Sequence, residues 1–111
     1  MNNPRVFPRG PMSIGRWRKE IDTFDRALVK LLNRRARCSL AIGRLKYAAG
    51  LPLFHRGRER QIAENVRHAN RGPLPNPALQ HIFEQILLAT RLSVREMLRA
   101  ERRAQRRHAK K

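Results

Sequence analysis

One cation interrupts the apolar face of a long helical segment, and a second cation points in nearly the same direction. Between residues 14 and 49, apolar side chains recur at steps of four and three, but one position on this face holds Arg35. Lys46 follows eleven residues later and points in nearly the same direction around a helix. A buried arginine is costly unless it is paired or faces an anion. Because the small residues Ser39 and Gly43 lie between the two cations, the pattern predicts a concave basic patch that binds a small anion.

Further polar residues fall at inward positions of the predicted helices. Arg58 and Glu59 open the second helix, and Thr90 lies on the apolar face of the third. Arg18 precedes Arg35 by seventeen residues, which places it about 100° around the helix. It therefore cannot join the patch in its own chain, but the copy in a symmetric partner could. Each residue taken alone has a structural alternative. An arginine could be a solvated charge or part of a structural ion pair, and the threonine could be a core residue whose hydroxyl is hydrogen-bonded.

Other catalytic chemistries find no support in the sequence. The four histidines lack the spacing of metal ligands, and the single cysteine, Cys38, lies on the apolar face as a predicted core residue. The chain has no glycine-rich phosphate loop and no candidate Ser-His-Asp set. We therefore expect neither a metal nor a cofactor.

The elements that position these residues are predicted to be three helices. Ser13 is the expected N-cap of a helix that continues to about Ala49, where Gly50-Leu51-Pro52 ends it. Such a helix would be roughly 54 Å long, which exceeds the diameter of a compact domain of this size. Its apolar face needs a partner of similar length, so we expect dimerisation through it.

A short second helix is predicted from about residue 58 to 71. A medium third helix is predicted to begin with Asn76 as its N-cap and Pro77 as its first helical residue, and to fray near Leu98. No strand pattern occurs. The predicted organisation is all-α: a flexible arm over residues 1–12, a helical domain over 13–98 and a basic tail over 99–111.

The charge balance favours anionic partners. Lys and Arg number 26 against 8 Asp and Glu, a net charge of +18, of which the last thirteen residues carry +6. The lone cysteine fits a reducing compartment, and neither a signal peptide nor an apolar run long enough for a bilayer is recognisable. The sequence is thus expected to belong to a soluble cytoplasmic protein.

Several motifs, taken in order, resemble those of the type II, all-helical chorismate mutases. They are Trp17-Arg18, Leu31-Leu32-Asn33-Arg34-Arg35, Ile42-Gly43-Arg44-Leu45-Lys46, Arg58-Glu59-Arg60, Asn70-Arg71-Gly72-Pro73-Leu74 and Ile82-Phe83-Glu84-Gln85-Ile86. The resemblance covers about residues 14–97. It implies an isomerase that rearranges chorismate to prephenate in aromatic amino-acid biosynthesis, as an intertwined homodimer without cofactors.

The resemblance also implies a role for each site residue. Arg18 from the other subunit and Arg35 would bind the two carboxylates of the substrate, and Lys46 would reach a carboxylate and the ether oxygen. Arg58 would support the carboxylate site, and Glu59 would accept a hydrogen bond from the ring hydroxyl. Thr90 stands where the family commonly has a small hydroxyl residue.

Two residues depart from the family pattern. Val94 stands where the family has a Gln or Glu that donates to the ether oxygen, and losing one such donor typically costs about 10²–10³ in rate. His55 replaces a frequent acid in the loop before the second helix. The expected mutase is therefore a slow one, or one activated by a partner enzyme.

Three alternatives remain open at this point. An isochorismate pyruvate-lyase of the same fold would release pyruvate and salicylate. A non-catalytic chorismate-binding or regulatory module would bind chorismate without turnover, as the valine suggests. A helical nucleic-acid-binding protein is motivated by the net charge of +18 and by the basic tail.

Overall fold

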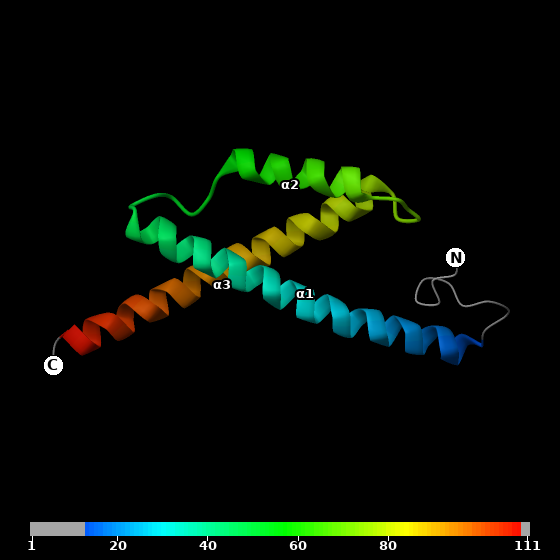
Figure 1. The fold of residues 1–111 in the computed structure, drawn as a ribbon, viewed down its shortest axis with the longest axis horizontal. Coiled ribbons are helices and arrows are strands. Elements are labelled where there is room, and N and C mark those ends of the chain that lie inside the picture. The colour runs from blue at the N-terminus through cyan, green and yellow to red at the C-terminus, as the bar shows by residue number, and fades with distance from the viewer. Residues whose placement is uncertain (1–12, 110–111) are drawn as a thin grey trace, which may run out of the picture. The chain divides into compact units, whose positions relative to one another are not determined.

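A computed structural model describes residues 13–109, and the described chain consists of three α-helices. These are α1 (Ile14–Ala48), α2 (Arg56–Ala69) and α3 (Asn76–Ala109), which follow one another along the chain in Figure 1. The all-α, three-helix prediction is confirmed. The predicted N-terminal arm lies outside the described residues. None of the described helices is apolar over enough of its length to cross a bilayer.

Helix α1 begins and ends through local hydrogen bonds that its sequence encodes. The Ser13 hydroxyl oxygen accepts from the Arg16 amide at 3.2 Å, so Ser13 is the predicted N-cap. At the other end, Gly50 adopts a φ of 70°, and the Leu51 amide donates to the Lys46 carbonyl at 2.8 Å. Together with the bond from the Gly50 amide to the Tyr47 carbonyl, this is a Schellman motif. A glycine is required there because the left-handed conformation disfavours side chains.

The described chain divides into two units, one ending at Asn33 and one beginning at Arg34. In the first unit, α1 has an apolar stripe whose side chains are 40–54% exposed: Trp17, Ile21, Phe24 and Leu28. A lone helix cannot bury its own stripe. Stabilisation of this segment must therefore come from packing against something else.

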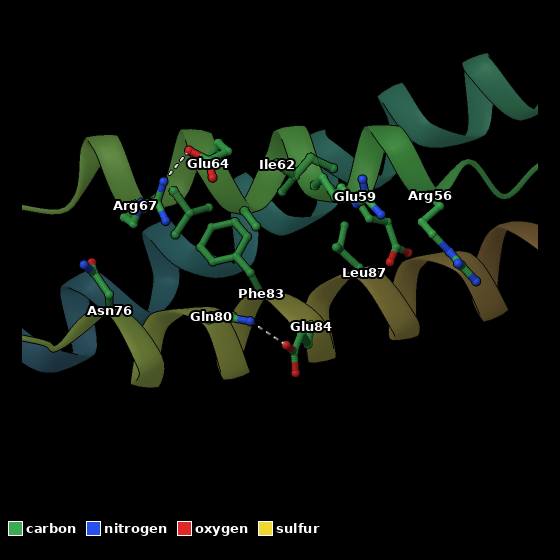
Figure 2. Close-up of a pocket in the computed structure, with 13 residues that line it drawn as sticks. Arg56, Glu59, Ile62, Glu64, Arg67, Asn76, Gln80, Phe83, Glu84 and Leu87 are labelled. Atoms are coloured by element: carbon green, nitrogen blue, oxygen red, sulfur yellow. Dashed lines mark hydrogen bonds and ion pairs between the residues drawn. The ribbon is translucent and has the colours of Figure 1, made fainter.

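The second unit contains the end of α1, all of α2 and all of α3. Figure 2 shows α2 lying along the first half of α3, with Ile62, Phe83 and Leu87 between the two helices. Within residues 13–109, only Val94 and Leu98 are buried hydrophobic residues, each 5% exposed. A Cβ added to Gly43 would lie 3.1 Å from a methyl group of each, so this glycine permits the close contact between α1 and α3.

Helix α2 lies two residues earlier than predicted. It begins at Arg56 because His55 caps it, and it ends at Ala69, with Asn70 as the C-cap. The Asn70 side chain then ties the loop to α3 by donating to the Leu74 carbonyl at 2.9 Å and to the Asn76 side-chain oxygen at 2.7 Å. The Pro75 carbonyl accepts the first hydrogen bonds of α3, so Asn76 is the first helical residue and was wrongly predicted as the N-cap.

The third helix does not fray near Leu98, which corrects the prediction of a medium-length element. It continues to Ala109 and has 34 residues, against 35 in α1. Two contacts with α1 hold this continuation. Arg44 donates to both carboxylate oxygens of Glu101, the shortest bond being 2.6 Å, and the Arg102 guanidinium lies 4.6 Å from the centre of the Tyr47 ring.

The contact between Arg44 and Glu101 responds to pH in a defined direction. The hydrogen bonds from Arg44 lower the pKa of the Glu101 carboxyl, and the same bonds raise the pKa of the arginine. A carboxyl whose pKa is lower in the folded chain stabilises that chain above its ordinary pKa. This stabilisation is lost as the pH falls through the folded-state pKa.

Candidate active site

A cavity of about 250 Å³ lies within the second unit and takes side chains from all three helices and the first loop. Its lining includes most of the residues predicted for the site. They are Arg35 and Lys46 from α1, His55 from the loop, Arg58 and Glu59 from α2, and Thr90 and Val94 from α3. Residues far apart in the sequence therefore line the same cavity.

The lining is strongly cationic. Four of its side chains are positively charged, namely Arg35, Lys46, Arg58 and Arg91, against one acid, Glu59. Among the ion pairs of residues 13–109, none involves the first three of these cations. Cations that surround a cavity and are not paired with an acid attract an anionic ligand, and guanidinium groups bind carboxylates in a bidentate manner.

Lys46 is held in place by the loop that follows α1. Its ammonium donates to the Leu53 carbonyl at 3.2 Å in a partly buried position. An ammonium has three N–H donors, so two remain for a ligand. The loop thus fixes the position of the charge without neutralising it.

His55 has a structural role that the sequence did not reveal. Its Nδ1 accepts from the Arg58 amide at 3.1 Å, and its φ of −140° and ψ of 109° are typical of an N-cap residue. An acid at this position could make the same bond with a carboxylate oxygen. Replacing the acid by histidine therefore keeps the helix start that carries Arg58 and Glu59.

Changing His55→Ala is expected to lower the free energy of unfolding by about 1 kcal/mol, because the first turn of α2 loses its cap. His55→Asp, the matched control, should stay close to the parent protein. Urea unfolding of the three proteins at equal concentration measures the difference. If aspartate were as destabilising as alanine, the capping role would be wrong.

Arg91 lines the cavity but was not among the predicted site residues. Its guanidinium lies 3.6 Å from the Glu59 carboxylate and 5.1 Å from the centre of the Phe54 ring. The sequence held a signal for it: Arg91 follows Leu87 by four residues and precedes Val94 by three, so it occupies a position on the inward face of α3. By contacting both the loop and α2, it orients the only acid in the lining.

Val94 has a packing role as well as a place in the lining. It is 5% exposed, and its methyl group would be 3.1 Å from a Cβ at Gly43. The neighbouring inward position, Thr90, is half-buried and contributes to the same cavity.

Cys38, predicted as a core residue, is exposed and lines the cavity. Among residues 13–109 no three His, Cys, Asp or Glu side chains are grouped to hold a metal ion.

Arg18 is the predicted site residue that belongs to the first unit. It lies on an exposed turn of α1, four residues after the start of the helix. The cavity described above consists of residues of the second unit only. The role of Arg18 stays a prediction.

The sequence matches the chorismate mutase type II family over residues 17–94. The chain belongs to this family. The match includes every predicted site residue, from Arg18 to Val94, and the predicted resemblance is confirmed. The chain therefore contains a chorismate mutase domain, and the cationic cavity lies within it.

Relatives of this chorismate mutase domain include enzymes with a second activity. The chain is 41% identical over 76 residues to the bifunctional chorismate mutase/prephenate dehydratase of Aquifex aeolicus (strain VF5), covering 65% of this chain and 21% of that protein. It is 33% identical over 70 residues to the protein of the same description from Neisseria gonorrhoeae, covering 63% of this chain and 19% of that protein. The chain thus spans about a fifth of the length of these curated relatives.

Solved structures agree with this assignment. The fold resembles chorismate mutase (form II) from Thermus thermophilus with a TM-score of 0.68 and 34% sequence identity, covering 69% of this chain and 88% of that one. Form I of the same protein gives the same TM-score and identity and is covered to 96%. These values show a shared chorismate mutase fold.

Proposed function

We propose that this chain catalyses the rearrangement of chorismate to prephenate in the biosynthesis of aromatic amino acids. The observation that carries the proposal is the cavity of the chorismate mutase domain, whose lining has four cations and one acid. Chorismate is a dicarboxylate, so such a cavity complements its charge. The reaction has one substrate and needs no nucleophile, metal or cofactor.

Arginine and lysine side chains can supply the catalysis that this reaction requires. Arg35 would bind one carboxylate and hold the flexible substrate in a compact reactive conformation. Lys46 would use its free N–H donors to stabilise the negative charge that develops on the ether oxygen as the bond breaks. Arg58 would support the carboxylate site.

The polar residues of α2 and α3 would position the other end of the substrate. Glu59 would accept a hydrogen bond from the ring hydroxyl, with Arg91 holding its carboxylate 3.6 Å away. Thr90 would line the same end through its hydroxyl group. Val94 can donate no hydrogen bond, so we expect slow turnover, or turnover that a partner enzyme raises.

The test is to incubate the purified protein with chorismate, follow its loss by ultraviolet absorbance and identify the product. Prephenate would support the proposal. In a parallel incubation with isochorismate, release of pyruvate and salicylate would identify a pyruvate-lyase instead. Saturable chorismate binding without turnover would identify a non-catalytic binding module, the alternative that Val94 favours. The single, exposed cysteine also fits the reducing cytoplasm as the site of action.

We further propose that the active unit is an intertwined homodimer. The apolar stripe of the first unit is exposed, and more large apolar side chains of α1 are exposed beyond it, among them Leu31, Ile42 and Leu45. So many exposed large apolar side chains on one helix are typical of a protein interface. In such a dimer Arg18 of each chain would enter the cavity of the other and bind the second carboxylate.

Mixing two inactive variants tests the shared site. Arg18→Ala and Arg35→Ala homodimers are each expected to lose most activity, because each lacks one carboxylate ligand at both sites. After subunit exchange, half of the dimers would be mixed, and in each of these one site would hold both defects and the other neither. Activity should then rise to about a quarter of the parent value. If activity stayed at the level of the separate variants, the donation of Arg18 between chains would be wrong.

A further inference from the structure

The last three turns of α3 present arginines on the side that faces away from α1. Arg99, Arg103, Arg106 and Arg107 are all exposed and fall within about 100° of the helix circumference at 3.6 residues per turn. The inward side of the same turns carries Leu98, Glu101 and Arg102, which contact α1. We call the four exposed arginines the basic stripe; the C-terminal turns that carry it end the ribbon in red in Figure 1.

The acids near the basic stripe do not neutralise it. Glu101 is bonded to Arg44 on the inward side, and Glu96 makes a 3.6 Å contact with Arg99. That second pair is exposed, and exposed ion pairs contribute little because water and salt screen them. Among residues 13–109, no ion pair involves the other three arginines of the stripe.

Neither the mutase domain nor helix stability accounts for the basic stripe. The family match ends at Val94, and no residue of the stripe lines the cavity. Basic side chains in the last turn of a helix favour its dipole, which explains Arg106 and Arg107 but not the two arginines before them. Like charges four residues apart, such as Arg99 and Arg103, destabilise a helix slightly. The stripe is therefore better explained by an anionic partner.

We propose that the basic stripe binds the phosphate backbone of duplex nucleic acid without reading its bases. Arginine forks match phosphate geometry, and four arginines spread over about 12 Å of helix can each contact one phosphate of the two strands that border a groove. Only small or polar residues, such as Ala100 and Ala104, lie between the arginines. The stripe thus has no apolar centre for a protein interface and no aromatic ring to stack on bases.

The test measures how the affinity of the full chain for a 20-base-pair duplex depends on salt. Changing the four stripe arginines to glutamine is expected to reduce the slope of log K against log salt by about 3–4, because each phosphate contact contributes about 0.9. A control with the same charge loss changes four exposed arginines elsewhere to glutamine: Arg37, Arg56, Arg60 and Arg71. Its slope should fall by less than about 1 if the contacts are local.

Further measurements keep the result decisive. A variant with lysine at all four stripe positions retains the charge and should retain the slope even where its affinity falls, so loss of the slope in it would overturn the proposal. Far-UV circular dichroism and chorismate turnover should be unchanged in this variant, since the stripe lies outside the cavity. Equal losses in the stripe variant and the charge-matched control would show a general effect of net charge. Competition by polyglutamate as strong as by duplex would show an acidic protein partner; either result would overturn the proposal.

Discussion

Arg35→Ala is expected to lower kcat/KM for chorismate by about 10²–10³-fold, because truncating one member of a buried, hydrogen-bonded charge pair costs about 2–5 kcal/mol. Arg35 is half-buried at the cavity, and no ion pair among the described residues competes for it. Its loss would remove a carboxylate ligand that also restricts the conformation of the substrate. Initial rates of chorismate disappearance measure the effect.

The adjacent residue supplies the control for this experiment. Arg34 carries the same charge but is exposed and does not line the cavity, so Arg34→Ala should keep its activity within a few-fold. Both variants remove one positive charge from α1, and a general electrostatic attraction would affect them equally. Equal losses of activity would contradict a specific role for Arg35.

Val94→Gln is expected to raise kcat by about 10²-fold, since one donor at a developing negative charge typically contributes about 10²–10³ in rate. Val94 lines the cavity next to Gly43, within the lining that also includes Lys46. A glutamine amide at this position would supply the hydrogen bond to the ether oxygen that valine cannot. Single-turnover rates with saturating chorismate isolate this chemical step.

A control must separate the effect of the larger side chain from the effect of its hydrogen-bond donor. Val94 is 5% exposed and in close contact with Gly43, so a longer side chain will strain the packing between α1 and α3. Val94→Met adds similar bulk but no donor, and we expect it to lose stability without gaining rate. A similar gain in both variants would mean that cavity shape, rather than the missing hydrogen bond, limits turnover.

The helices and most of the cavity could be predicted because local patterns encode them. Ser13, the Gly50 turn and the apolar spacing define α1 without tertiary information. The interruption of that spacing at Arg35 and the later Lys46 pointed to the cavity that both residues line. Dimerisation and the contribution of Arg18 stay predictions, because they depend on a second chain.

The features that were missed depend on long-range contacts. The part of α3 after Leu98 was predicted as a basic tail, because its sequence is a run of charged residues typical of a solvated extension. Within residues 13–109, its packing partners on α1 come from the bond between Arg44 and Glu101, 57 residues apart, and from the contact of Arg102 with Tyr47. Arg91 was missed for a similar reason, because its partners Glu59 and Phe54 lie on other elements.

The segment between α1 and α2 is exposed except at Leu53, and exposed loops usually accept insertions. This one is constrained at both ends by the groups that would bind substrate. The Leu53 carbonyl holds the Lys46 ammonium, and His55 fixes the turn from which Arg58 projects. Lengthening the loop by even one residue would move one cationic group relative to the other. Its length is therefore part of the specificity of the site, and neither circular permutation nor domain fusion should be attempted there.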